Sequence, residues 1–249
     1  MSQATLRFYG NLNDFLPPAR RQVACAHTCV EHGSIKDLIE SIGAPHTEVE
    51  YIIVNDQSVN FGYLVRDGDR IDVYPIFEPV DVTPLVPVRP PLLAKTGFVL
   101  DTHLGQLAVY LRMLGFDTLY RNDYPDAELA CISSTEQRVL LTRDRGLLKR
   151  SIVTYGYYIR ETNPQRQVAE VLRRYNLFTA INPFRRCIRC NGMLASISKA
   201  AVRDRVPPKT FQYYDTFHIC ETCAQIYWKG SHYERMQQFI ESVLNGDRG

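Results

Sequence analysis

The 249-residue sequence lacks any run of 18 uncharged apolar residues, so it holds no segment typical of a membrane-spanning helix. Its first residues, MSQATLRFYG, also lack the charged region and following apolar region of a secretory leader. We therefore expect a cytoplasmic protein with no membrane partner. Hydrophobic residues make up 45% of the chain, which is enough for real cores in one large domain or in two to three small ones.

An even set of cysteines is also missing, which argues against a complete disulfide framework. The chain has seven cysteines, of which Cys25, Cys29 and Cys131 are scattered among apolar residues as free thiols often are. The other four fall into two Cys-x-x-Cys pairs late in the chain. This distribution predicts a reducing compartment and a single metal site.

The two pairs, Cys187 with Cys190 and Cys220 with Cys223, each place two thiolates on one tight turn, and together they predict a tetrahedral Cys₄ zinc ribbon. Thiolates fill all four positions and leave no site for water, so a structural Zn²⁺ is expected. The spacing between the pairs is longer than the usual ~15 to 20 residues, so we expect residues 196–217 to loop out. Reduced cysteines or a redox pair remain the alternative.

Proline is concentrated between the N-terminal third and the rest of the chain, at Pro79, Pro84, Pro87, Pro90 and Pro91. Because proline fixes φ and removes a backbone donor, this stretch is typical of an extended linker. We expect an N-terminal domain at 1–80, the linker at 81–95, a second domain at 96–180, and a zinc ribbon with a C-terminal helix at 181–249.

The N-terminal segment has the pattern of a small mixed α/β domain. Alternation predicts a strand at 5–10, helical spacing predicts a helix at 34–43, and further strands are expected at 51–55 and 69–77. This order resembles the β-grasp fold of ubiquitin-like and sulfur-carrier proteins. A carrier would need a free C-terminal Gly-Gly, whereas this chain continues into the linker, so we expect an accessory domain for stability or for docking a protein partner.

The second segment alternates between short apolar runs and helical periods. Strands are expected at 97–101, 117–121, 138–143 and 155–160, with helical stretches such as 102–115 between them. Alternating strands and helices predict a parallel-sheet α/β domain. Ligands of such sheets bind beyond the carboxyl ends of the strands, so the residues that follow each strand are the candidates for a site.

Acidic residues occupy these positions. Asp101 and Asp144 each follow a predicted strand directly, and Asp126 opens a predicted helix with Glu128 two residues later. Carboxylates that converge in a crevice favour a hard cation, and Mg²⁺ or Mn²⁺ can orient a water for attack on a phosphate. The alternative is that Asp101, Asp126 and Asp144 are helix N-caps, a role that does not preclude metal binding.

Charge is unevenly divided along the chain. Residues 1–90 carry 7 Lys/Arg against 12 Asp/Glu, a net −5, and the remainder carries 22 against 15, a net +7. The basic part predicts a polyanionic partner, with a solvated basic face as the alternative. The cations expected to hold a phosphate backbone beside the acids are Arg112, Arg143, Arg145 and Lys149.

Around the cysteine pairs, basic and aromatic residues are interleaved. Such a mixture can hold a backbone while it stacks unpaired bases, as single-stranded RNA recognition requires. Packing of the aromatics against the preceding domain, and a packed or capping histidine, remain the alternatives. The candidates for RNA contact here are Arg186, Trp228 and His232.

Several motifs occur together in a fixed order: FVLDTHLGQLAVYLRMLGFDTLY, DYPDAEL, LLTRDRGLL, the two cysteine pairs, VPPKTF and YWKGSHYERM. Over about residues 97–238 the chain resembles the Mut-seven C-terminal RNase domain family, of which bacterial members also carry an N-terminal ubiquitin-like domain. The resemblance implies a PIN-like nuclease with a zinc ribbon, in which Asp101, Asp126 and Asp144 bind metal. PIN domains commonly use a fourth acid, for which Glu128 and Asp123 are the candidates.

The leading hypothesis is thus an endoribonuclease that hydrolyses RNA phosphodiesters with Mg²⁺ or Mn²⁺, its RNA (tRNA, rRNA or mRNA) undetermined. The alternative is a non-catalytic RNA-binding or ribosome-associated factor that uses the basic face and the ribbon. A sulfur-transfer scaffold that keeps only a ubiquitin-like interaction surface is a third hypothesis.

Overall fold

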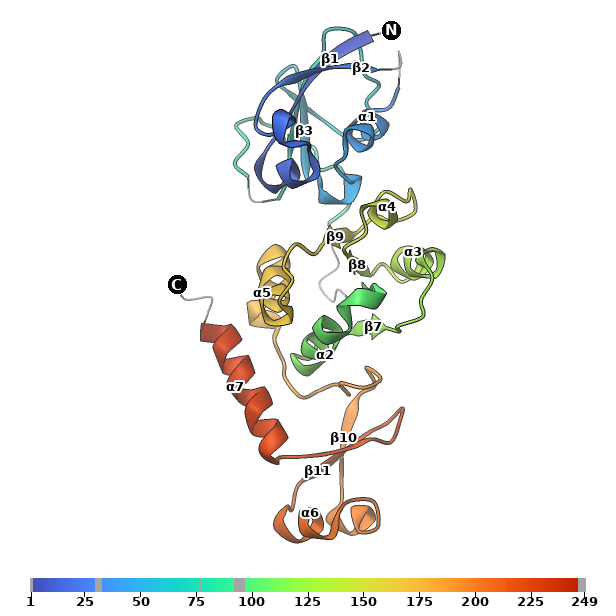
Figure 1. The fold of residues 1–249 in the computed structure, drawn as a ribbon, viewed down its shortest axis with the longest axis vertical. Coiled ribbons are helices and arrows are strands. Elements are labelled where there is room, and N and C mark those ends of the chain that lie inside the picture. The colour runs from blue at the N-terminus through green and yellow to red at the C-terminus, as the bar shows by residue number, and fades with distance from the viewer. Residues whose placement is uncertain (1, 30–32, 77, 92–96, 246–249) are drawn as a thin grey trace. The chain divides into compact units, whose positions relative to one another are not determined.

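A computed structural model describes residues 2–29, 33–76, 78–91 and 97–245 (Figure 1). The chain divides into two compact units, which we describe separately. Unit 1 comprises Met1–Lys95 and Asp126–Tyr158, and unit 2 comprises Thr96–Pro125 and Ile159–Gly249. Among the helices of the described residues, none has both the length and the apolar character needed to cross a bilayer.

The N-terminal part of unit 1 is a β-grasp domain, as the sequence predicts. Its sheet has the strand order β2-β1-β5-β3-β4, with β1 parallel to β5 and the other pairs antiparallel. Short 3₁₀ turns connect some of the elements, at Gly10–Phe15, Pro18–Arg20 and His46–Glu48. The elements are β1 (Ser2–Phe8), β2 (Cys25–Cys29), α1 (Ile35–Ile42), β3 (Tyr51–Val54), β4 (Gln57–Val59) and β5 (Arg70–Tyr74).

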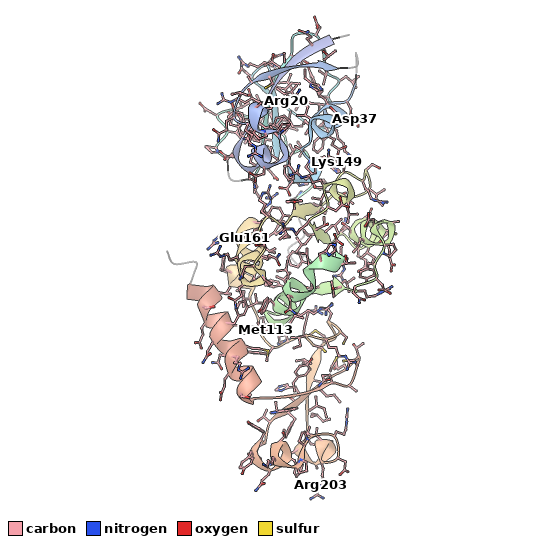
Figure 2. The ribbon with its side chains drawn as sticks, in the orientation of Figure 1. Arg20, Asp37, Met113, Lys149, Glu161 and Arg203 are labelled. Atoms are coloured by element: carbon pink, nitrogen blue, oxygen red, sulfur yellow. The ribbon has the colours of Figure 1, made fainter. Side chains whose placement is uncertain are left out.

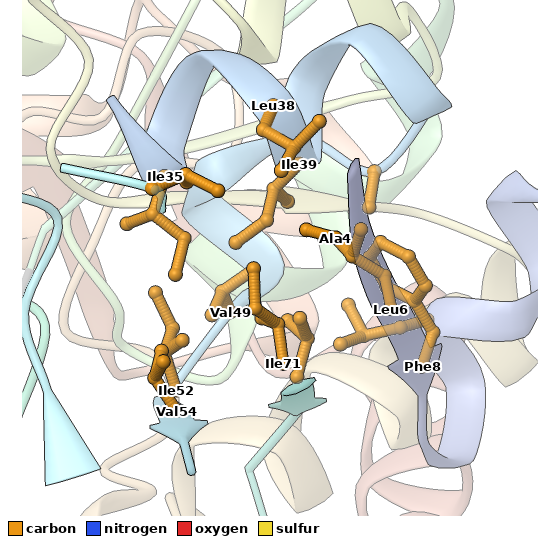
Figure 3. Packing of buried hydrophobic residues seen from close by; sticks show 14 of the residues in the cluster. Ala4, Leu6, Phe8, Ile35, Leu38, Ile39, Val49, Ile52, Val54 and Ile71 are labelled. Atoms are coloured by element: carbon orange, nitrogen blue, oxygen red, sulfur yellow. The ribbon is translucent and has the colours of Figure 1, made fainter. Parts of the chain in front are cut away.

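Alternating apolar residues hold this domain together. In β1, Leu6 and Phe8 point to the buried face, where they meet residues of α1 such as Ile39 (Figure 3). Helix α1 begins at its cap Ser34, whose hydroxyl accepts a hydrogen bond from the Asp37 backbone N–H at 3.1 Å. One helix thus covers the apolar face of the sheet.

The proline-rich stretch carries no helix or strand over its described residues 81–91, in line with the predicted linker. It is nevertheless held against the β-grasp domain. Arg89 donates through Nη1 to the Val49 carbonyl and through Nη2 to the Glu50 carboxylate, both at 2.7 Å. The Val86 backbone N–H also donates to the Ser58 hydroxyl at 2.9 Å. Residues 92–95 of the predicted linker lie outside the described part.

The four strands predicted for the second domain all form. Strands β6 and β7 pair in parallel within unit 2, and β8 and β9 pair in parallel within unit 1, as expected for an α/β domain. Every residue of β6 and of β8 is buried.

Unit 2 contributes β6 (Phe98–Leu100), the 3₁₀ turn η4 (Thr102–Leu104), α2 (Gly105–Met113), β7 (Thr118–Tyr120) and α5 (Pro164–Tyr175). Unit 1 contributes α3 (Asp126–Thr135), β8 (Val139–Thr142), α4 (Arg145–Leu148) and β9 (Gly156–Tyr158).

The C-terminal part of unit 2 is an antiparallel three-stranded sheet of order β10-β11-β12, followed by a helix. Its elements are β10 (Leu194–Ile197), η6 (Lys199–Val202), α6 (Pro208–Tyr213), β11 (Phe217–Cys220), β12 (Ile226–Trp228) and α7 (Ser231–Asn245). The segment 196–217, expected to loop out, folds into η6 and α6 instead. Its residues Val202 and Val206 pack with Phe217 and Ile226 in the small core of the ribbon.

Candidate functional site

Asp101 lies directly after β6 in unit 2, as predicted. Its side chain is only 8% exposed. Its Oδ1 accepts hydrogen bonds from the Thr102 backbone N–H at 2.6 Å and from the Thr102 hydroxyl at 3.2 Å, so it caps η4. The turn is braced by Tyr120, whose hydroxyl donates to the Thr102 carbonyl at 2.9 Å. The Asp101 carboxylate is therefore held in a defined orientation.

Asp144 and Asp126 belong to unit 1. Asp144 is exposed at the end of β8 and caps α4, where its Oδ1 accepts from the Gly146 N–H at 2.6 Å and the Leu147 N–H at 3.4 Å. Asp126 is the first residue of α3, and its carboxylate lies 4.0 Å from the Arg150 guanidinium, with both side chains about half exposed. Capping by Asp101 and Asp144 is confirmed, and metal binding by the three acids stays a prediction.

The candidates for a fourth acid differ in their surroundings. Asp123 is exposed and accepts a hydrogen bond from Arg121 Nε at 2.9 Å, and this bond lowers the pKa of Asp123. Glu128 is half-buried in the first turn of α3. Asp123 is thus already engaged by a local cation, whereas Glu128 shares a helix with Asp126.

Arg112, predicted to bind RNA, is buried, with 4% of its surface exposed. Its guanidinium donates to four backbone carbonyls: from Nε to Thr118 at 2.9 Å, from Nη1 to Ile188 at 3.2 Å and to Arg189 at 3.1 Å, and from Nη2 to Tyr120 at 3.5 Å. Burial lowers the pKa of Arg112, an effect that the nearby thiols of Cys190 and Cys187 oppose. Because these bonds join α2 and β7 to the first cysteine turn, Arg112 has a structural role.

Two further predicted cations are bonded to the β-grasp domain within unit 1. Lys149, labelled in Figure 2, donates from Nζ to the Glu40 carbonyl at 2.6 Å. The Arg145 guanidinium donates to the Phe15 carbonyl at 3.4 Å and lies over the Phe15 and Tyr158 rings, 5.1 and 5.7 Å from their centroids. Both cations are therefore engaged in intramolecular contacts with the β-grasp domain.

Buried polar groups reinforce the same contact. Glu48 is 1% exposed, and its Oε1 accepts from the Tyr158 backbone N–H at 2.6 Å. His46, also buried, makes hydrogen bonds from Nε2 to the Val153 carbonyl at 2.8 Å and from Nδ1 to the Glu40 carboxylate at 2.6 Å. The predicted docking role of the β-grasp domain therefore has an intramolecular component.

The remaining predicted cations lie at the surface or near the cysteines. Arg143 is exposed immediately before Asp144. Arg186 is half-buried, donates from Nη1 to the Asn191 carbonyl at 3.0 Å, and lies 3.5 Å from the Asp117 carboxylate. Arg143 is thus an exposed predicted cation directly beside an acidic candidate.

The four cysteines of the two predicted turns come together in the ribbon. Cys187 Sγ lies 3.6 Å from Cys223 Sγ, and Cys190 Sγ lies 3.4 Å from Cys220 Sγ. All four sulfurs fall within 4.8 Å of one another. A tetrahedral ion with Zn–S bonds of about 2.3 Å requires sulfurs about 3.8 Å apart, so this set fits zinc. Among the described residues, no other group of three or more His, Cys, Asp or Glu side chains is gathered in this way.

The thiols differ in their proton affinity. Burial is the largest influence on the Cys190 thiol and raises its pKa to about 12. Burial also acts to raise the pKa of Cys220, but hydrogen bonds from the backbone N–H groups of Cys223 and Thr222, together with those from the Cys190 and Cys223 side chains, outweigh it and lower that pKa to about 7. These backbone donors favour a thiolate, which is the form that binds metal.

Two residues near the cysteines make contacts that the sequence did not predict. Asn191, at φ +72°, accepts through Oδ1 from the Thr118 N–H at 3.0 Å and donates through Nδ2 to the Asp117 carboxylate at 2.7 Å. The hydroxyl of Tyr227 lies 3.0 Å from Cys187 Sγ. Asparagine tolerates left-handed backbone, so its place directly after Cys190 was a usable signal for Asn191.

The aromatic candidates lie at the edge of the ribbon. Trp228 ends β12, is half-buried, and packs against the ribbon core. His232 lies in α7, and its side chain is not among those that the structure describes. Trp228 also lines two cavities between the ribbon strands and α7, which Tyr227 and Tyr233 line with it.

Comparison with known families finds two family models that match the chain. The model of the Mut7-C RNAse domain matches residues 96–240, which is more than half of the chain. The model of the Mut7-C ubiquitin domain matches residues 1–81. No curated protein and no solved structure shows a significant match.

Proposed function

From the premise that the chain belongs to the Mut7-C RNase family, we propose that it is a ribonuclease that hydrolyses RNA phosphodiesters with a divalent metal ion. The observation that carries this proposal is the family match, which spans Asp101, Asp126 and Asp144. Asp101 directly follows β6, and Asp144 is the second residue after β8, so both lie at the carboxyl ends of strands in the parallel pairs. These are the positions at which open α/β sheets bind their ligands.

In this proposal, Asp101, Asp126 and Asp144 hold the ion, and Glu128 is the candidate for a fourth carboxylate. Oxygen donors of this kind suit Mg²⁺ or Mn²⁺. When bound, such an ion neutralises a phosphate oxygen and makes a bound water a better nucleophile. The chain itself orients the carboxylate of Asp101 through its bonds to Thr102, and offers Arg143 as a cation for the RNA backbone.

The ribbon has a supporting role in the proposal. A structural Zn²⁺ on the four cysteines orders the ribbon, which presents the aromatic residue Trp228 and the cation Arg186 to RNA. The thiolates require a reducing compartment, for which the cytoplasm is proposed. Lys149 and Arg145 already contact part of the β-grasp domain. A protein partner of this domain would therefore have to bind another part of its surface.

The test is cleavage of single-stranded and structured RNA by the purified, zinc-loaded chain with added Mn²⁺. Replacing Asp101 and Asp144 together by asparagine removes two charged ligands, while asparagine caps helices as well as aspartate does. We expect the double variant to lose more than about a hundredfold in cleavage rate, since even partners of metal ligands contribute about 10- to 100-fold. The matched control is Asp204→Asn, an exposed aspartate of the ribbon, which should cut normally. Full activity of the double variant would refute the proposal.

A non-catalytic RNA-binding factor is the second candidate. It is favoured by one observation: the only gathered metal-ligand set among the described residues is that of the cysteines. This alternative predicts RNA binding that weakens steeply with salt and does not respond to Mn²⁺, without cleavage. An RNA whose cleavage requires Mn²⁺ and Asp144 would exclude it.

A further inference from the structure

The two cavities beside β12 have the shape and lining of a ligand site. The larger, of about 580 Å³, is lined by Tyr214, Tyr227, Trp228, Tyr233, Gln225 and Arg189, among others. The smaller, of about 110 Å³, shares Tyr227, Trp228 and Tyr233 with it. Specific ligand sites typically have volumes of about 300 to 1,000 Å³, mostly apolar walls and a few polar groups. The larger cavity meets this description.

The charges around the cavities are of one sign. Arg189 lines the larger cavity, and Arg186 and Lys229 line the smaller one. Among the described residues that line either cavity, none is acidic. The Lys229 ammonium lies 5.7 Å from the centroid of the Tyr233 ring, so one cation sits directly beside an aromatic wall. Aromatic walls with cations at hand suit a ligand that is both flat and negatively charged.

The zinc site and the aromatic wall are physically connected. Tyr227 contacts Cys187 Sγ through its hydroxyl and lines both cavities, so the first cysteine turn holds its ring in place. Gly230 lets the indole of Trp228 lie close to the chain, because a Cβ there would come within 2.9 Å of Trp228 Nε1. The rings are thus positioned by the ribbon before any ligand arrives.

We propose that this larger cavity, the β12 pocket, binds an unpaired base of single-stranded RNA by stacking on Trp228 and Tyr233, with Arg189 and Lys229 at its phosphates. Rings that stack bases and cations that follow the backbone are the combination by which proteins bind single strands. The proposal rests on the RNA substrate of the proposed function and names its binding subsite. It does not depend on catalysis at the aspartates.

The chain offers a direct probe, because Trp228 is its only tryptophan. The full-length, zinc-loaded protein is titrated without Mg²⁺ or Mn²⁺ with an oligoadenylate of about eight nucleotides, a length within the usual range for single-strand sites. We expect saturable quenching of tryptophan fluorescence. The same oligomer with abasic sugars should bind about tenfold more weakly, measured by anisotropy of a labelled end, and should not quench.

Paired variants test the pocket itself. Tyr233→Leu removes one stacking ring and should weaken oligoadenylate binding about tenfold. Its matched control is Tyr213→Leu, at a tyrosine that is 71% exposed and outside both linings, which should bind as the wild type does. Zinc content of each variant reports whether the ribbon is intact. Gly230→Ala offers a second route, since the added methyl displaces the indole and should reduce quenching.

The β12 pocket would be overturned by equal quenching and affinity for the abasic oligomer, by RNA binding without quenching, or by wild-type affinity in Tyr233→Leu. Absence of RNA binding would overturn it as well. Quenching by a protein that does not cut RNA would support the β12 pocket and contradict the nuclease proposal. Cleavage without quenching would support the nuclease proposal and contradict the β12 pocket.

Discussion

The β-grasp domain and the zinc ribbon, at opposite ends of the sequence, are stabilised in different ways. Among the described residues, the β-grasp domain buries sixteen hydrophobic residues in one cluster, whereas the ribbon cluster has four, Val202, Val206, Phe217 and Ile226. A cluster of sixteen buried residues can stabilise a small fold, whereas a cluster of four needs the additional stability that a bound metal provides. The ribbon therefore need not bury all its aromatic residues, and Tyr227 and Trp228 lie half-buried on its edge strand β12.

Removal of zinc should have the largest effect. Structural Zn²⁺ contributes about 10 kcal/mol to the folding of small domains, so a chelator, or Cys220→Ser, should unfold β10–β12 while β1–β5 remain folded. Amide signals in a heteronuclear NMR spectrum would distinguish the two regions. Cys131→Ser is the control, because Cys131 is exposed and lies outside the cysteine set. Ribbon signals that stay dispersed without zinc would contradict the claim that the ribbon, unlike the β-grasp domain, depends on zinc to fold.

A change in the β-grasp core should come next. Ile52 is fully buried between sheet and helix, so Ile52→Ala should lower the free energy of unfolding of that domain by about 3 kcal/mol through lost burial and a cavity. Urea titration followed by the same NMR signals measures it. Zinc content should not change, and Val23→Ala, at a residue that is 47% exposed, is the control. Loss of zinc in Ile52→Ala would show that the two regions fold together.

The smallest effect is expected at Arg112, which joins α2 and β7 to the first cysteine turn. Arg112→Met removes the donor to the buried Thr118 carbonyl and to the part-buried Ile188 carbonyl, which should lower the free energy of unfolding by about 2 kcal/mol. Thermal unfolding and zinc release to a competing chelator would both detect this loss. Arg121→Met, at an exposed arginine, is the matched control. If both variants release zinc at the wild-type rate, the ribbon does not depend on this contact.

Much of the fold followed from local pattern. The strands at Leu6, Phe98 and Leu140 were predicted because alternation or a continuous apolar run extends over neighbouring residues. The two cysteine turns were predicted for a similar reason, because two ligands three residues apart already define a tight turn. The spacer between them was misjudged, since the burial of Val202 and Val206 depends on strands that lie later in the chain.

The cations predicted to bind RNA were harder to interpret. Arg112, Arg145 and Lys149 have the sequence context of phosphate-binding residues, yet all three donate to backbone carbonyls. Every residue presents a carbonyl, so nothing in the sequence marks the acceptor. The partners lie far along the chain, as with Arg112 and Arg189, which are 77 residues apart.

The sequence by itself thus determined β1, β3, the strands from β5 to β9, helix α1 and the two cysteine turns, because each depends on residues within a few positions of one another. Tertiary structure decided which charged groups are used internally, how the rings of Trp228 and Tyr233 come to line one cavity, and where Tyr227 meets Cys187. Those outcomes depend on burial and on partners distant in sequence, which only the folded chain brings together.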